Sequence, residues 1–183
     1  EYFTGDNFTA PALSRVESRL EFYWPETTSP GPGVPGDYFS TRWTGRLTVP
    51  ATGSWQFFAD VDDGLRLWVN GQLLLDKWNP PPAVYWGLAS TSIALTAGTA
   101  YDFKVEYQDF FSDAYLNFRW AGPGTPQQGV PPSAFSLPPS GPDLTSPGVT
   151  LSAPGTATGP FTVTAAFSEP VSGLTSADFI VTN

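Results

Sequence analysis

The chain has 183 residues, a formal net charge of −9, no cysteine and no histidine, and it is rich in aromatic residues (15%), glycine (18) and proline (20). Disulfides, thiolate metal sites and catalytic triads with a histidine base are therefore excluded. No basic cluster offers the electrostatic footprint of a protein that binds nucleic acid or an anionic membrane surface. Cations and neutral ligands fit this charge better as partners.

Frequent breakers separate short aromatic and β-branched runs, and no long stretch has helical spacing. This pattern predicts an all-β protein, either a sandwich or a barrel. At the N-terminus, the aromatic segment 1–8 favours an edge strand, whereas residues 13–22 have mixed polarity. Residues 24–36, WPETTSPGPGVPG, are expected to form a loop, because proline and glycine do not fit a regular hydrogen-bond ladder.

Downstream of Tyr38 the sequence alternates between apolar and polar residues in several short runs. Residues Asn70-Gly71 between two of these runs predict a tight hairpin turn. Inward-facing rows that would form the core are expected on two further runs, one comprising Phe103, Val105 and Tyr107 and the other Leu116, Phe118 and Trp120. The predicted strands are 40–49, 53–59, 64–70, 72–76, 91–95, 101–107 and 114–120.

Residues 83–101 contain no charged side chain over a length close to that of a membrane span. Serine and threonine residues interrupt this stretch, Gly87 and Gly98 break it, and residues 92–95 alternate as a strand does. We therefore expect no membrane span in this segment.

Two consecutive aspartates, Asp62 and Asp63, precede the predicted hairpin, and Gly64 follows them. Glycine tolerates backbone angles that other residues avoid. In an ordinary strand neighbouring side chains point to opposite faces, so the two carboxylates would not meet at one ion. A cis peptide bond would bring them together, and a hard cation bound by both could hold that form. The alternative is an acidic turn without a metal, because Asp-Gly is a common turn pair.

Several motifs occur in order along the chain, namely STRWTGR from Ser40, GSWQF from Gly53, DDGLRLWVNG from Asp62, then Tyr107, and LNFRW from Leu116. In this order and at these spacings they resemble the PA14 domain, first named from anthrax protective antigen, over residues 2–135. The resemblance implies an antiparallel β-sandwich of a kind that occurs in toxins, glycosidase inserts and microbial adhesins. In the lectin members, an Asp-Asp pair with a cis peptide bond binds calcium, and the calcium binds sugar hydroxyls directly.

For this chain the resemblance implies a calcium site at Asp62 and Asp63. Family members supply further ligands from a second loop, expected here at residues 108–113, QDFFSD. Gln108 and Asp109 are the predicted ligands from this loop, with Asp113 as a substitute, although each could instead be a solvated loop residue. Calcium takes six to eight oxygen ligands, so backbone carbonyls, water or sugar must complete its shell.

Aromatic side chains near the same end of the sandwich could shape a sugar site. Phe110 and Phe111 lie on the second loop, and Trp78 and Trp86 flank the sequence NPPPAVY. Alternatively, these rings close the core or cover an interdomain contact. The predicted ligand-binding residues are Asp62, Asp63, Trp78, Phe110 and Phe111.

The composition changes after Phe135, so we predict a domain at 1–135, a semi-rigid Pro/Gly-rich linker at 136–148, and a second module at 149–183. The last segment resembles the opening strands of bacterial immunoglobulin-like repeats. Its roughly 35 residues cannot close a sandwich that takes about 100. We expect further immunoglobulin-like repeats, or another copy of the chain, to supply the missing strands.

Together these features predict a calcium-dependent, glycan-binding adhesin module of a secreted or cell-surface protein, with no enzymatic activity. The alternative is a structural or assembly module of an extracellular protein or filament that binds no sugar. Asp62 and Asp63 are too close in sequence to flank a glycosidic bond as the two carboxylates of a glycosidase do. Because the pair lies outside the inward rows, replacing either aspartate is expected to leave the fold intact.

Overall fold

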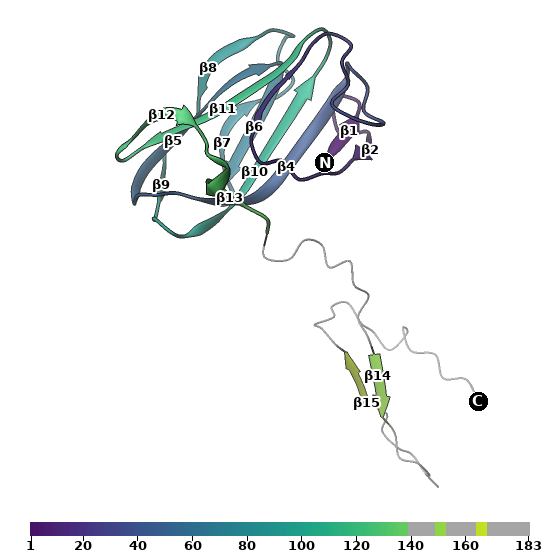
Figure 1. Ribbon diagram of the computed structural model, residues 1–183, viewed down its shortest axis with the longest axis vertical. Helices are drawn as coiled ribbons and strands as arrows, with labels where there is room; N and C mark the ends of the chain where they lie inside the picture. The colour runs from purple at the N-terminus through teal and green to yellow at the C-terminus, as the bar shows by residue number, and fades with distance from the viewer. Residues whose placement is uncertain (139–148, 153–163, 168–183) are drawn as a thin grey trace, which may run out of the picture. The chain divides into compact units, whose positions relative to one another are not determined.

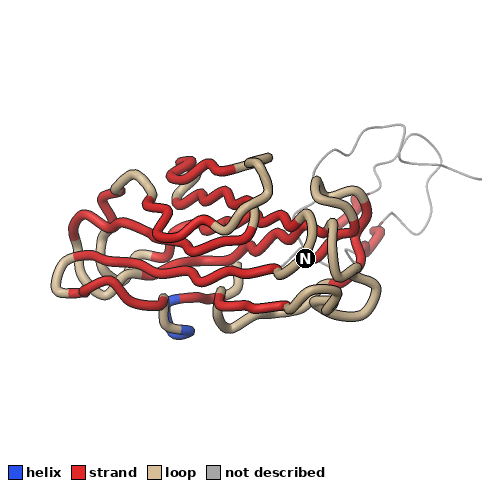
Figure 2. Tube along the Cα trace, turned by 90° about the horizontal axis from the view of Figure 1, so that it is seen from above, coloured by secondary structure: helices blue, strands red, loops and turns tan. Residues whose placement is uncertain are grey.

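The computed structural model describes residues 1–138, 149–152 and 164–167. The chain divides into two compact units, Glu1–Pro139 and Ser140–Asn183. The first unit is a β-sandwich of two antiparallel sheets, as Figures 1 and 2 show. The described residues contain no α-helix and only one 3₁₀ turn, η1 (Pro132–Ala134). The predicted all-β, antiparallel sandwich is therefore confirmed.

The first sheet has the strand order β2-β1-β4-β10-β6-β7, with β13 paired to β4. The N-terminal aromatic segment forms a strand as expected, but it is not the edge, because β2 lies outside β1. The strands of this sheet are β1 (Tyr2–Thr4), β2 (Ala10–Leu13), β4 (Phe39–Thr48), β6 (Gly64–Val69), β7 (Gln72–Lys77), β10 (Ala100–Asp109) and β13 (Phe135–Ser136).

The second sheet has the order β12-β11-β5-β8, with β3 paired to β11 and β9 paired to β5. Strands β3, β8 and β12 were not predicted. The residues of β12, TPQQG, show no apolar alternation, and the register of β8 against β5 is shifted. The strands are β3 (Glu21–Trp24), β5 (Gly53–Asp62), β8 (Tyr85–Ala89), β9 (Ile93–Leu95), β11 (Ala114–Gly122) and β12 (Thr125–Gly129).

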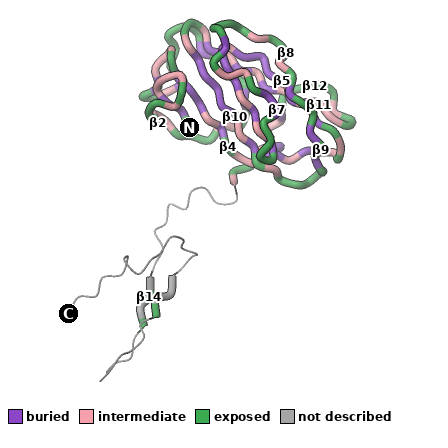
Figure 3. Tube along the Cα trace, turned by 180° about the vertical axis from the view of Figure 1, so that it is seen from behind, coloured by how far each residue is buried: buried purple, intermediate pink, exposed green. Residues whose placement is uncertain are grey.

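The core lies between the two sheets, where alternate residues of the central strands, among them β5, β6 and β11, are buried (Figure 3). Both predicted inward rows, on β10 and β11, are among the buried side chains. Each large apolar side chain buried in this way stabilises the fold by roughly 1.5–3 kcal/mol. The predicted turn is also present, since Asn70 and Gly71 both have positive φ, 51° and 73°, as a tight hairpin requires. No helix of the described residues is long and apolar enough to cross a membrane.

In the second unit the structure describes two short strands, β14 (Val149–Ser152) and β15 (Thr164–Phe167), which pair in antiparallel fashion. Most of the predicted linker (139–148) and of the predicted immunoglobulin-like module (153–163 and 168–183) lies outside the described residues. The linker was predicted to begin at Ser136, but Ser136 still belongs to the first sheet, through β13. The immunoglobulin-like character of the second unit stays a prediction.

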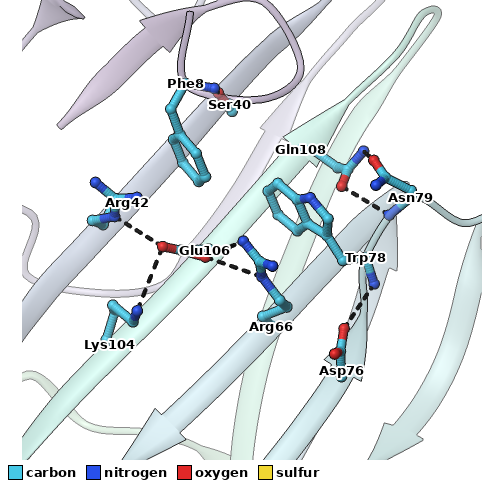
Figure 4. Close-up of polar contacts among 10 residues, drawn as sticks. All are labelled: Phe8, Ser40, Arg42, Arg66, Asp76, Trp78, Asn79, Lys104, Glu106 and Gln108. Atoms are coloured by element: carbon cyan, nitrogen blue, oxygen red, sulfur yellow. Dashed lines mark hydrogen bonds and ion pairs between the residues drawn. The ribbon is translucent and has the colours of Figure 1, made fainter. Parts of the chain in front are cut away.

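The outer face of the first sheet holds one buried carboxylate among three cations (Figure 4). Glu106 is 3% exposed and accepts hydrogen bonds from Arg42 Nε at 2.9 Å and Arg66 Nη2 at 2.6 Å. Lys104 Nζ lies 3.6 Å from the same carboxylate. Burial acts to raise the pKa of Glu106, but the hydrogen bonds from Arg42 and Arg66 outweigh it, so this pKa lies below its ordinary value.

Replacing Glu106 by alanine is expected to lower the free energy of unfolding by about 2–3 kcal/mol, because it leaves Arg42 and Arg66 without their shared carboxylate partner. Asp102→Ala is the control. Asp102 pairs with Arg46 at 3.2 Å, but its side chain is 77% exposed, so its loss should cost less than about 1 kcal/mol. Denaturant unfolding of both variants measures the difference, and equal losses would contradict a structural role for the Glu106 network.

Candidate functional site

The aspartate pair lies at the junction of β5 and β6, since Asp62 ends β5 and Gly64 begins β6. The peptide bond between Asp62 and Asp63 is cis, as predicted. Gly64 is needed for a different reason from the one expected, because its φ is not positive. A Cβ at this position would lie 2.7 Å from the Gln108 side chain and 3.0 Å from the carbonyl oxygen of Lys77. Close packing, not an unusual backbone angle, therefore favours glycine here.

Asp63 is 1% exposed and holds two loops in place. Its Oδ1 accepts the backbone N–H of Ala83 at 2.9 Å, on the β7–β8 loop, and its Oδ2 accepts that of Phe110 at 2.8 Å, on the β10–β11 loop. Its own N–H donates to the carbonyl oxygen of Gln108 at 3.2 Å. Asp63 is thus a structural residue as well as a candidate ligand. For Asp63, these contacts contradict the expectation that replacing either aspartate would leave the fold intact.

Asp109 is fully buried, at 0% exposure, and neither of its carboxylate oxygens has a hydrogen-bond partner among the described residues. It is the last residue of β10 and pairs with Phe39 on β4. Asp37, two residues before Phe39, likewise has a buried Oδ1 without a partner. A buried ionised carboxylate without a partner is costly, so such a group either keeps its proton or lies beside a bound cation.

The carboxylates of Asp37, Asp62 and Asp63 all act on that of Asp109, and these four are called the acidic cluster below. Burial, together with the charges of Asp63, Asp37 and Asp62, raises the pKa of Asp109 to about 8, against the nearby backbone N–H of Tyr38, which lowers it and donates to the Phe110 carbonyl oxygen. Burial and the charge of Asp63 raise the pKa of Asp62. Burial raises the pKa of Asp63 too, against the hydrogen bonds from Phe110 and Ala83. A positive charge placed among these groups would relieve their repulsion.

The chain itself supplies no such charge among its described residues. Of its eight lysines and arginines, three surround Glu106, and Lys77 lies with its ammonium 4.4 Å from the centre of the Tyr85 ring. The other four form ion pairs elsewhere, namely Arg15–Glu17, Arg19–Glu21, Arg46–Asp102 and Arg119–Asp60. An external cation is the remaining source of positive charge.

Carboxylates alone do not make a complete metal site here. In the described part of the chain, no group of three or more carboxylates is already arranged to hold a metal ion. Calcium takes six to eight oxygen ligands and accepts carboxylates, carbonyls and water together. The residues present fit calcium only if backbone carbonyls, water or ligand oxygens join the carboxylates. The unpartnered oxygens of Asp109 are the observation that favours this fit.

The two ligands predicted from the second loop lie at the end of β10 and not in a loop, because Gln108 and Asp109 pair with Ser40 and Phe39 on β4. The side chain of Gln108 lies on the outer face of the first sheet (Figure 4). Its Oε1 accepts the backbone N–H of Asn79 at 3.0 Å, and its Nε2 donates to Asn79 Oδ1 at 3.3 Å. Its backbone carbonyl, not its side chain, contacts Asp63.

The substitute ligand Asp113 holds the β3–β4 loop. Its Oδ2 accepts the hydroxyl of Tyr23 at 2.9 Å, and its Oδ1 accepts the backbone N–H of Glu26 at 2.8 Å. Asp37, in contrast, was not predicted, although its charge acts on Asp109. Its position follows from the pairing of Phe39 with Asp109, and no short motif in the sequence signals that pairing.

The predicted aromatic residues fall into two places. Phe110 is half-buried and joins the loops, since its carbonyl accepts the N–H of Tyr38 at 3.1 Å, while Phe111 on the same loop is 51% exposed. Trp78 lies on the outer face of the first sheet (Figure 4), where its ring stacks on Phe8 at 5.5 Å and the Arg66 guanidinium lies 4.1 Å from its centre. Phe110 thus adjoins the acidic cluster, whereas Trp78 packs within the Glu106 network.

A PA14 domain family model matches residues 1–134. The chain belongs to the PA14 domain family. This confirms the family that the motifs indicated, over nearly the predicted span. The PA14 domain is 34% identical over 133 residues to the Anti-sigma-I factor RsgI3 of Acetivibrio thermocellus, a match that covers 73% of this chain and 20% of that protein. The chain thus spans only about a fifth of the length of this relative.

Solved structures share the fold. An anti-sigma factor domain-containing protein from Clostridium clariflavum is 29% identical, with a TM-score of 0.69, over 82% of this chain and 51% of that one. A structure described as the PA14 sugar-binding domain from an RTX adhesin is 17% identical, with a TM-score of 0.58, over 75% and 96% of the two chains. At this identity the second likeness shows the fold alone.

When calcium is removed, the raised pKa of Asp109 in the acidic cluster should make the stability of the fold depend on pH. The pKa of Asp109 rises from 3.8 to about 8 on folding, so the folded chain binds this proton more tightly than the unfolded chain. Folding takes up protons in this window, and the free energy of unfolding in chelator should therefore fall as pH rises from about 5 to 8. The pKa of Glu106 is lowered, so Glu106 makes the free energy of unfolding rise with pH, but only below this pH range.

Thermal unfolding in chelator at pH 5, 6.5 and 8 measures the effect, with Asp109→Asn as the matched variant. This substitution removes the titrating group, so its melting temperature should vary less with pH than that of the parent. Parallel pH profiles for the two chains would show that the titration of Asp109 does not cause the loss of stability.

Proposed function

We propose that this PA14 domain is a calcium-dependent carbohydrate-binding module of an extracellular or cell-surface protein. The observation that carries the proposal is Asp109, a fully buried carboxylate that has no partner in the described part of the chain and is influenced by the charges of Asp62 and Asp63. The cations of the chain are engaged elsewhere. Calcium suits such a site because it is a hard cation that accepts oxygen ligands in flexible geometry. Zinc is disfavoured, because the chain has no cysteine or histidine to bind it.

In this proposal Asp62, Asp63 and Asp109 hold the ion, with backbone carbonyls of the adjoining loops as further ligands. A bound calcium supplies open coordination positions for sugar hydroxyls. Asp62 is the partly exposed member of the pair, so it faces the side from which a ligand arrives. Gln108 was also predicted as a ligand, and its backbone carbonyl is the group that lies next to Asp63.

The protein's own part in recognition is to fix the loops around the ion. Asp63 binds the β7–β8 and β10–β11 loops through Ala83 and Phe110, so the rim of the site is ordered before a ligand binds. Ordering of this kind reduces the entropy lost on binding. The exposed rings of Phe111 and Tyr38 are available to pack on the apolar face of a sugar. The net charge of −9 favours neutral glycans over polyanions.

The relatives named as anti-sigma factors extend the proposal to the whole protein. A glycan-binding module in such a protein would serve as its sensing part, and adhesion would be the other use of the same site. Both uses require the same calcium-dependent recognition. A purely structural module would require neither calcium nor sugar, and an enzyme would release sugar products.

Calcium titration tests the proposal. We expect millimolar calcium to raise the melting temperature of the parent, because a ligand that binds only the folded chain stabilises it. Asp62→Asn and Asp109→Asn should each weaken calcium binding at least about tenfold in calorimetry, because each removes a charged ligand. Asp102→Asn, at a carboxylate that is 77% exposed and paired with Arg46, is the control and should bind calcium as the parent does.

A glycan array probed with and without chelator completes the test. Binding to sugars should appear with calcium, disappear with chelator, and be absent in Asp62→Asn. The structural alternative would be supported if calcium did not change the melting temperature of the parent and the parent bound no glycan on the array. Release of reducing sugar from any bound glycan would assign the chain to the enzymes.

A further inference from the structure

The outer face of the second sheet carries three aromatic rings in a line that adjoins Asp62. Tyr23 on β3 lies opposite Tyr115 on β11, and Tyr115 in turn lies opposite Asp62 on β5. Trp86 on β8, the strand beyond β5, packs against Tyr115 with ring centres 5.7 Å apart, and the Tyr23 and Tyr115 ring centres are 6.3 Å apart. Tyr23, Tyr115 and Trp86 are called the aromatic strip below.

The strip is open to solvent although its rings are large. Trp86 is 69% exposed and Tyr23 is 58% exposed. Isolated exposed aromatic residues need no explanation, but a connected row of rings across the strands of one sheet is typical of a binding surface. The rings are inclined to one another by 54° and 67°, so together they form a twisted surface and not a flat one.

Polar contacts beneath and beside the strip hold its rings in place. The hydroxyl of Tyr23 donates to Asp113. Next to Trp86, the backbone N–H of Gly87 donates to Asp60 Oδ1 at 2.6 Å, and the Arg119 guanidinium lies 2.6 Å from the same oxygen. Asp60 is only 7% exposed. The end of the strip at β8 is therefore anchored to the sheet before any ligand binds.

The strip is continuous with the acidic cluster. Asp62 follows Tyr115 in the same cross-strand row, and residues directly opposite in a sheet project to the same face. A molecule bound at Asp62 could extend over Tyr115 without leaving the surface.

We propose that the aromatic strip is an extended subsite for a neutral polysaccharide of pyranose units, in which one unit binds at the acidic cluster and its neighbours pack on Tyr115, Tyr23 and Trp86. This rests on the calcium-dependent function proposed above. Arg119, which lies on β11 with Tyr115, is paired with Asp60, and Glu21, Asp62 and Asp113 are acidic. This charge disfavours a polyanion. The inclined rings suit a single twisted chain better than the flat face of a crystalline polymer.

The proposal predicts that affinity increases with chain length. Once one sugar unit is bound at Asp62, the neighbouring units of the same chain are held close to the strip, at high effective concentration. Contact with one aromatic ring contributes a factor of about two to ten in affinity, so the strip as a whole should contribute at least tenfold. A site confined to the acidic cluster would instead bind a monosaccharide and its oligomers almost equally.

Binding of glucose, mannose and xylose is compared with binding of their β-1,4-linked hexamers, by NMR titration in millimolar calcium. We expect at least one hexamer to bind tenfold or more tightly than its monomer. Trp86→Ala and Tyr23→Ala should each reduce this ratio several-fold while calcium affinity stays at the parent value. Leu137→Ala truncates a side chain that is 64% exposed and follows β13 on the other sheet, and it should leave the ratio unchanged. Thermal unfolding verifies that all variants are folded.

Several results would overturn the inference. These are equal binding of monomers and hexamers, no binding of any hexamer, a ratio unaffected by Trp86→Ala, or binding of a galacturonate hexamer alone. Self-association that Trp86→Ala abolishes would assign the strip to a contact between copies. A failure of the proposed calcium function can be told apart from a failure of this inference. If hexamer binding persists in chelator but is lost in Trp86→Ala, the strip is the binding site and calcium has no role in it.

Discussion

The charge at one end of the sandwich is the constraint on which the candidate function depends. Two carboxylate sites show how differently the fold treats buried negative charge. Glu106 lies among Arg42, Arg66 and Lys104, and these partners keep its pKa below the ordinary value. Asp109, equally buried, lies among other aspartates, and its pKa is raised to about 8. Three cations neutralise Glu106, whereas no cation of the chain neutralises Asp109. A cation from solution could therefore bind at Asp109.

The core and the family could be predicted from the sequence because they depend on local patterns. Alternation places Phe103, Val105 and Tyr107 inward, and Asn70-Gly71 specifies its own turn, so neighbours in sequence decide both features. The aspartate pair was found for the same reason, since its motif is continuous. Strand β12 was missed because its residues, TPQQG, carry no alternation.

The details of the site could not be predicted because they depend on pairing between distant strands. Asp37 approaches Asp109 only because β4 and β10 are neighbours. The side chain of Gln108 turns outward to Asn79. Pairing of β10 with β6 places Gln108 opposite Gly64, which leaves room only for glycine at that position. Trp78 packs with Phe8 and Arg66 for a similar reason, since β6 and β7 bring Arg66 and Trp78 to one face. Spacing along the chain carries no information about such contacts.

A crystal structure of the chain grown with calcium, with the anomalous signal used to locate the ion, tests the central claim most directly. We expect one ion with oxygen ligands at roughly 2.3–2.6 Å, including carboxylate oxygens of Asp62, Asp63 and Asp109. Ordered water in place of the ion at millimolar calcium, with the Asp109 carboxylate still unpartnered, would contradict it.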